Sequence, residues 1–158
     1  MIEVNDSVIG RLVYEYGWCR NYTLTIFGVA TSTRLTVPCD EGVDIEASQR
    51  EAFAQFDARK DDLTLIAEEA IFHHYQDGCI EYRERLGDLA DELAPVISEK
   101  TEIQKLLTLT GVVVQQSFGA NERIVGLLFD CSWEPDLGLA VKFVNESIDE
   151  VGPQDIVL

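Results

Sequence analysis

The segment DLTLIAEEAIFHHYQ, from Asp62 to Gln76, sets the architecture of this chain. Its apolar residues recur three and four positions apart, which predicts an amphipathic helix. Two apolar sets lie on roughly opposite sides of that helix, namely Leu63, Ile66, Ala67, Ala70 and His74 against Leu65, Phe72 and Tyr75. We therefore expect the helix to be covered from two directions. The remaining narrow polar stripe consists of Asp62, Glu69, His73 and Gln76.

The helical pattern continues on both sides of this segment. One face of an earlier helix is formed by Ile45, Gln49, Ala52, Phe53 and Phe56. Lys60-Asp61-Asp62 separates the two helices, and Asp77-Gly78 is a typical stop signal. We expect a third helix from about Ile80 to Leu93, with these residues facing inward: Tyr82, Leu86, Leu89 and Leu93. Ser98 can cap a short fourth helix that ends near Leu107.

Strand-forming sequences flank the helical middle. Residues 8–16, 22–29 and 31–37 precede it, and residues 109–116, 124–129, 137–144 and 148–151 follow it. These segments are rich in β-branched and aromatic residues or alternate between polar and apolar positions. We therefore predict an α+β chain that forms a single domain over residues 1–158. The N- and C-terminal strands are expected to form a largely antiparallel sheet, with the central helical block packed on one face.

The charge of the chain is strongly one-sided. Its 158 residues include 29 Asp and Glu against 12 Lys and Arg, a formal net charge of −17. Residues 40–102 contain 18 acids and 6 bases, so 12 of the 17 surplus negative charges lie in the helical middle. The resulting field attracts basic partners and raises their encounter rate. It argues against binding to nucleic acid or to an anionic membrane, where Lys and Arg supply the affinity.

The expected third helix concentrates acids on one side. Its outward positions are Glu81, Glu84, Asp88, Asp91 and Glu92. Carboxylates four positions apart, such as Glu84 and Asp88, destabilise an isolated helix by about 0.2–0.5 kcal/mol per pair. Two interpretations are open. The stripe is either a solvated face that keeps the protein soluble, or a docking surface for a basic protein.

A second candidate site lies in the segment DCSWEPDLG, from Asp130 to Gly138. Its oxygen-bearing side chains alternate as at the start of an EF-hand loop. However, Pro135 stands where that loop needs glycine, and Val141 stands where it needs glutamate. A tight connection between two strands is therefore expected. Trp133 is either a core residue or an exposed anchor of the docking surface, to which we also assign Glu134 and Asp136.

The sequence offers little for catalysis or metal binding. His73 and His74 are adjacent on a helix, so they point about 100° apart and cannot jointly hold a metal ion. Four cysteines lack zinc-ligand or redox-motif spacing and are expected to be reduced thiols: Cys19, Cys39, Cys79 and Cys131. The sequence has no glycine-rich phosphate loop, nucleophile elbow or dinucleotide fingerprint. We expect no cofactor, no metal and no enzymatic activity.

Targeting signals are also missing from the sequence. The N-terminal residues, MIEVND, lack the basic region and apolar run of a signal peptide. No apolar stretch approaches the roughly 20 residues of a membrane-spanning helix. We therefore expect a cytoplasmic protein.

Most of the chain from about residue 45 onward resembles a family of small uncharacterised bacterial domains. The resemblance rests on three runs: Leu93 to Ser98, Gly126 to Val141, and Val151 to Asp155. Members of that family typically show a Cys-Thr-Trp-Asp motif, a Glu-His-Gly-Leu-Gly-Val strand and a Gly-x-x-Asp ending. In this chain Ser132 replaces Thr, Glu134 replaces Asp, and Asp136-Leu137 replaces Glu-His. The helical middle fits the family through residues 52–56 and 72–75. The resemblance carries over no catalytic residue.

Members of this family resemble immunity proteins encoded beside polymorphic toxins, including those of contact-dependent growth inhibition. The resemblance thus implies a cytoplasmic protein that binds and neutralises a cognate toxin domain. The negative charge favours a basic nuclease as that toxin, with acids occluding its active site. Two alternatives are a small acidic housekeeping binding domain without a toxin partner, and an enzyme built on a Cys–His pair that meets only in the folded chain.

Overall fold

A computed structural model describes residues 2–158 of the chain and contains one eight-stranded sheet. The strands follow one another across the sheet in chain order. They are β1 (Glu3–Asp6), β2 (Gly10–Tyr14), β3 (Trp18–Ile26), β4 (Val29–Val37), β5 (Leu107–Gln115), β6 (Ile124–Cys131), β7 (Leu139–Val144) and β8 (Ser147–Gly152). Every neighbouring pair is antiparallel except β4 and β5, which are parallel. The predicted α+β class and largely antiparallel sheet are confirmed.

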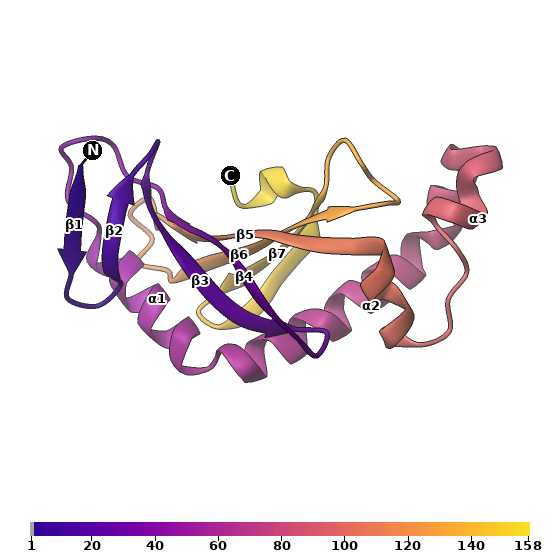
Figure 1. Ribbon diagram of the computed structural model, residues 1–158, viewed down its shortest axis with the longest axis horizontal. Helices are drawn as coiled ribbons and strands as arrows, with labels where there is room; N and C mark the ends of the chain where they lie inside the picture. Colours follow the sequence, from indigo (N-terminus) through magenta and orange to yellow (C-terminus); the bar gives the residue numbers. More distant parts are fainter. Residues whose placement is uncertain (1) are drawn as a thin grey trace.

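The parallel pair explains where the helices lie in the chain. Two neighbouring parallel strands need a long crossover connection, because the second must start at the same end as the first. That connection contains α1 (Ala47–Ala58), α2 (Lys60–Leu86), α3 (Ala90–Leu93) and the 3₁₀ helices η1 (Gly87–Leu89) and η2 (Lys100–Leu106). In Figure 1, α2 runs along most of the molecule and α3 lies beyond the strands at its right-hand end. Helix α1 packs against β5 and β6, and α2 packs against β3 and β8.

The core follows from the two periodicities of the sequence. In β3, Tyr22 and Leu24 are buried whereas Thr23 and Thr25 are exposed, as expected for alternate sides of a strand. In α2 the buried stripe recurs every four residues: Leu63, Ala67, Ile71, Tyr75 and Cys79. Leu65 and Ile66 are exposed. The expectation of cover from two directions is therefore wrong for this part of the helix.

Helix α2 does not stop at Asp77-Gly78 as predicted. A β-carbon on Gly78 would lie 2.6 Å from the phenol ring of Tyr82, so the absent side chain leaves room for that ring one turn further on. The helix continues to Leu86 and ends at Gly87, whose φ of 57° is left-handed. The predicted third helix is thus divided between the last turns of α2, η1 and α3.

Other boundaries differ in smaller ways. Strand β1 was not expected, because four residues carry too little pattern to detect. The predicted fourth helix is the 3₁₀ helix η2, and its N-cap is Glu99 rather than Ser98. The chain ends in the 3₁₀ helix η3 (Gln154–Ile156), after which buried Val157 packs over Gly126 of β6.

Two buried polar side chains tie the helices to the strands. Gln49 of α1 donates from Nε2 to the carbonyl oxygens of Pro38 and Val114, at 2.8 and 3.2 Å. Glu68 of α2 accepts the backbone N–H of Phe27 at 2.9 Å, in the turn between β3 and β4. These three hydrogen bonds satisfy groups that would otherwise be buried without a partner, which stabilises this docking of helices on the sheet.

Among residues 2–158, no helix combines the length and the apolar character needed to cross a lipid bilayer.

Candidate interaction surface

The five acids predicted on one helix gather at the end of the molecule formed by α2, η1 and α3 (Figure 1). All are exposed: Glu81, Glu84, Asp88, Asp91 and Glu92. The chain turns at Gly87, so they do not form the straight stripe that their spacing predicted. The acids therefore surround a helical corner rather than following one helix face.

The corner is held closed by Arg83. Its guanidinium donates to the backbone oxygens of Ala90 and Ala94 at 3.2 and 2.9 Å, and to Asp91 at 2.7 Å. The hydrogen bond from Arg83 to Asp91 raises the pKa of the arginine, so this cation remains charged at any physiological pH. Asp91 consequently has its charge matched within the molecule.

A second internal pair joins the corner to the β6–β7 connection. Arg85 of α2 lies 3.1 Å from Glu134. The other predicted acids, namely Glu81, Glu84, Asp88, Glu92 and Asp136, form no ion pair within residues 2–158. Most of the predicted charge therefore remains available to a partner.

A partly apolar hollow opens at this corner. After α3 the chain returns along α2, where Tyr75 donates to the carbonyl oxygen of Pro95 at 2.6 Å and Gln76 to that of Ile97 at 3.0 Å. Between the returning chain and the helix lies a depression of about 560 Å³. Ile80 and Val96 line it and are 74% and 77% exposed.

The depression has the layout of a protein-binding site. Buried Cys79 and Ala90 also line it, together with the polar side chains of Gln76, Arg83 and Glu84, and the side chain of Leu89 is exposed on the adjoining η1. An exposed apolar centre with charged residues around it is the arrangement found in protein–protein interfaces. We call Ile80, Val96, Leu89 and the unpaired acids Glu81, Glu84, Asp88 and Glu92 the α2–α3 surface.

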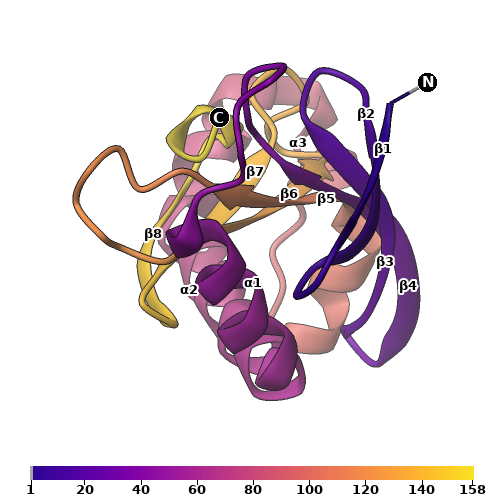
Figure 2. The same ribbon diagram turned by 90° about the vertical axis from the view of Figure 1, so that its left-hand side faces the viewer.

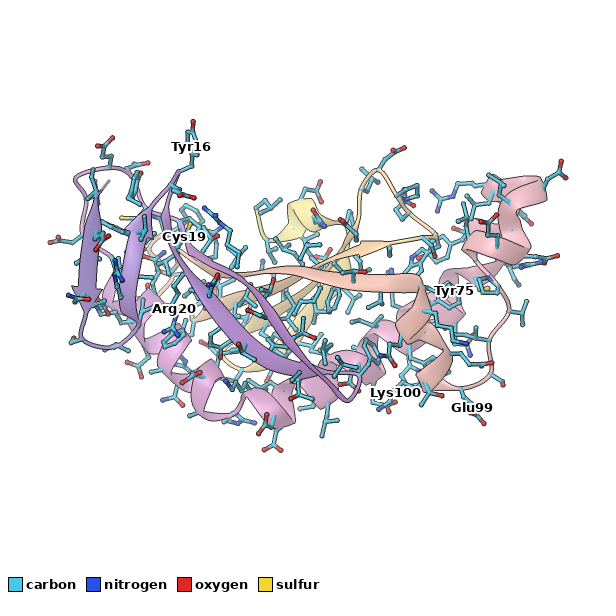
Figure 3. All side chains as sticks on the ribbon, viewed as in Figure 1. Tyr16, Cys19, Arg20, Tyr75, Glu99 and Lys100 are labelled. Carbon is cyan, nitrogen blue, oxygen red and sulfur yellow. The ribbon has the colours of Figure 1, made fainter. Side chains whose placement is uncertain are left out.

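Trp133 is a core residue and does not belong to this surface. Its side chain is only 3% exposed. The indole lies edge-on to the ring of Tyr75, with ring centroids 4.7 Å apart, and the centroid of the Tyr82 ring is 6.2 Å away. Figure 3 labels Tyr75 beside α2, near the start of β5. The interpretation of Trp133 as an exposed anchor is therefore wrong, and the indole instead fixes the β6–β7 connection against α2.

The same connection is anchored by polar contacts. Ser132 donates from Oγ to the carbonyl oxygen of Leu93 at 2.7 Å, and its backbone N–H donates to Leu106 at 2.8 Å. Burial raises the pKa of the neighbouring Cys131 thiol to about 12. Asp136 is exposed on the far part of this connection. The predicted tight connection between strands is confirmed, and its Glu134 is paired with Arg85.

The histidines and cysteines do not assemble. His73 lies 3.8 Å from Glu69 on the exposed side of α2, whereas Nε2 of His74 is 3.2 Å from the Tyr82 hydroxyl. Burial lowers the pKa of His74, which favours its neutral form. All four cysteines are buried free thiols. In the part of the chain that the structure describes, neither histidine makes a hydrogen bond to a cysteine, and no cluster of metal-ligating side chains is present.

Sequence reasoning missed the apolar part of the surface. It placed Leu89 inward and assigned no role to Ile80 or Val96, although all three are exposed. The sequence does contain a signal. Apolar residues recur every four positions from Leu63 to Cys79, and Ile80 lies outside that series. Gly78 masks this signal, because a glycine after a helical pattern is a typical helix end, whereas α2 continues through it to Leu86.

Comparison with known proteins identifies the family. Neither the curated proteins nor the solved structures yield a match to this chain. A family model described as a domain of unknown function, DUF6985, matches residues 8–158. That match covers nearly the whole sheet and all the helices described above. The chain therefore belongs to the DUF6985 family.

Proposed function

We propose that this protein binds a cationic protein through the α2–α3 surface. The observation that carries the proposal is the exposed hollow at Ile80 and Val96, which Glu84 also lines, at a corner of the molecule whose acids Glu81, Glu84, Asp88 and Glu92 have no internal ion-pair partner within residues 2–158. Burial of the two aliphatic side chains would set the dissociation rate, and the acids around them would mainly set the association rate.

The resemblance to immunity proteins suggests what the partner is. We propose a toxin domain with a basic active site, such as a nuclease, whose Lys and Arg normally contact substrate phosphates. Carboxylates of the α2–α3 surface would take the place of those phosphates and occlude the site. Because such a toxin acts in the cytosol, the proposed site of action is the cytoplasm.

The proposal includes an architectural element. We infer that α1 and α2 form a layer on one face of the sheet, supported by the packing of α1 on β5 and β6 and of α2 on β3 and β8. Helix α2 then projects past the strands and carries the α2–α3 surface away from the sheet. A partner could reach it without displacing a strand.

Charge reversal tests the surface. The variant Glu84→Lys/Asp88→Lys is compared with Glu51→Lys/Glu150→Lys, which changes the net charge equally at exposed positions on α1 and β8. Association with the polypeptide encoded immediately upstream is followed by stopped flow across a salt titration. We expect the first variant to associate at least about tenfold more slowly at low salt, with a flatter salt dependence. The second variant should stay close to wild type.

The two variants separate local from overall charge. Equal slowing in both would mean that net charge alone steers the encounter and that the α2–α3 surface has no special role. Ile80→Ala/Val96→Ala completes the test, because both side chains are too exposed for their loss to unfold the protein. It should raise the dissociation rate while the association rate is unchanged. A nuclease assay with and without this protein then shows whether binding neutralises the partner.

A further inference from the structure

Two aromatic side chains at the other end of the molecule project into solvent from unusual backbone. Tyr16 is 103% exposed and Phe118 is 79% exposed. Their φ angles are 58° and 52°, in the left-handed region that side chains larger than Asn rarely adopt. Figure 3 shows Tyr16 pointing away from the ribbon at the connection between β2 and β3. Neither aromatic ring gains burial that would offset the backbone strain.

The fold itself does not require an aromatic residue at either position. Each is followed by a glycine with positive φ, Gly17 or Gly119, as in turns where Asn-Gly is preferred. The chain offers an internal comparison in Phe27-Gly28, where Phe27 has a φ of 49°. Phe27 is partly buried against the core and its N–H is held by Glu68. There packing accounts for the aromatic residue, whereas at Tyr16 and Phe118 it does not.

Both residues lie at the same end of the sheet. Trp18, at the start of β3, pairs with Val37, at the end of β4. Parallel pairing places the end of β5 beside the end of β4, with Thr36 opposite Val113. The connections of residues 15–17, 38–46 and 116–123 therefore leave the sheet at one end, and we call them the loop face. Figure 2 looks onto this end, with the 116–123 loop projecting at its left.

The loop face is acidic as well as apolar. Asp40, Glu41 and Asp44 are exposed there, beside exposed Val43, and make no ion pair within residues 2–158. Burial raises the pKa of the Tyr14 phenol, and Glu41 and Asp40 add to that rise. Their negative field thus reaches the base of the β2–β3 connection that carries Tyr16.

We propose that the loop face docks a second cationic protein, with Tyr16 and Phe118 inserted into apolar sockets on that partner. Aromatic residues are enriched among interface hot spots because they bury a large area at little cost in side-chain freedom. The unpaired acids specify a basic rim on the partner by charge complementarity. The loop face lies at the opposite end from α3 (Figure 1), so this interaction is separate from the one proposed for the α2–α3 surface.

The first test needs no partner. Tyr16→Asn and Phe118→Asn relieve backbone strain and lose little burial, so each should raise the midpoint of thermal unfolding by about 2–4 °C. Phe27→Asn is the matched control, because it makes the same change at a buried aromatic and should lower the midpoint. If Tyr16→Asn and Phe118→Asn lower the midpoint as Phe27→Asn does, the rings serve the fold and the proposal is overturned.

The second test identifies the partner. A photoreactive phenylalanine replaces Tyr16, Phe118 or, as control, exposed Val29 at the far end of β4, and cross-linking is done in host cells. Positions 16 and 118 should give the same adduct with a basic polypeptide, and position 29 should not. In purified form, that polypeptide should bind the Tyr16→Asn/Phe118→Asn protein at least about thirtyfold more weakly than wild type. It should bind the Glu84→Lys/Asp88→Lys protein normally.

The outcomes separate the two surfaces. The proposal for the loop face would be overturned by different adducts at positions 16 and 118, or by an adduct with an acidic polypeptide. It would also be overturned if the Tyr16→Asn/Phe118→Asn protein bound the cross-linked polypeptide as tightly as wild type. If the polypeptide encoded upstream does not bind the α2–α3 surface, only the proposed function is refuted. The loop-face variants are tested with the cross-linked polypeptide instead, so that result leaves the loop-face proposal standing.

Discussion

Replacing Trp133 by phenylalanine distinguishes a core residue from a binding anchor. The ring is 3% exposed and lies against Tyr75 and Tyr82. Phenylalanine leaves a volume of about 40 Å³ unfilled, which costs about 1 kcal/mol at the measured penalty per unit of cavity volume. Loss of about 40 Å² of buried apolar area costs about 1 kcal/mol more. We therefore expect the free energy of unfolding to fall by about 2 kcal/mol.

Guanidinium titration followed by far-UV circular dichroism measures this loss. The midpoint should fall without a change in slope, and the thermal midpoint should fall by about 4–8 °C for a chain of this size. Trp18→Phe is the matched control, because Trp18 is only partly buried and packs edge-on to one ring, that of Tyr14. It should lose less stability than Trp133→Phe.

Binding provides the decisive comparison. The rate constants for the upstream polypeptide should be the same for Trp133→Phe and wild type under conditions where both are folded. If the variant instead keeps its stability and dissociates faster from that polypeptide, Trp133 reaches the partner in solution. The assignment of the apolar centre to Ile80 and Val96 would then be wrong.

Two further predictions concern the strands. Gly126→Ala should lower the free energy of unfolding by about 1–3 kcal/mol, because the added β-carbon would lie 2.7 Å from Val157. Hydrogen exchange should show the last residues of the chain less protected than in wild type. Unchanged protection would contradict the packing of Val157 on β6. Burial of Asp6 acts to raise the pKa of its carboxyl, but hydrogen bonds from Ile9, Arg50 and Val8 outweigh it, so the pKa lies below its ordinary value. The carboxylate therefore stabilises the fold above pH 4, and this contribution is lost as the pH falls through the lowered pKa. Asp6→Asn should lower the free energy of unfolding by about 1–3 kcal/mol at pH 7 and by progressively less below pH 4. A difference in stability between variant and wild type that stays constant across a pH series of denaturant titrations would refute this.

The accuracy of the sequence predictions depends on how local each signal is. The shared side of Leu63 and Ala67 and the alternation in β3 were predicted because a side chain's direction depends only on its own helix or strand. The rest of the stripe was not, because Tyr75 was assigned to the opposite side and Ile71 to neither. The end of α2 was mispredicted because Gly78 is a local stop signal that Tyr82 covers in the folded chain. The acids were found by counting, but their pairing was not, since Arg85 meets Glu134 from another part of the chain.

By itself the sequence determined the α+β class, the alternating faces of the strands and the excess of negative charge, because these depend on residue type and short-range spacing. Only the tertiary structure decided that Trp133 is buried, that Ile80 and Val96 are exposed, and that Tyr16 and Phe118 share one end of the sheet. The reason is physical. Burial and proximity arise from contacts between segments far apart in the chain, such as Tyr75 with Trp133, and no local pattern specifies which distant segment will cover a given side chain.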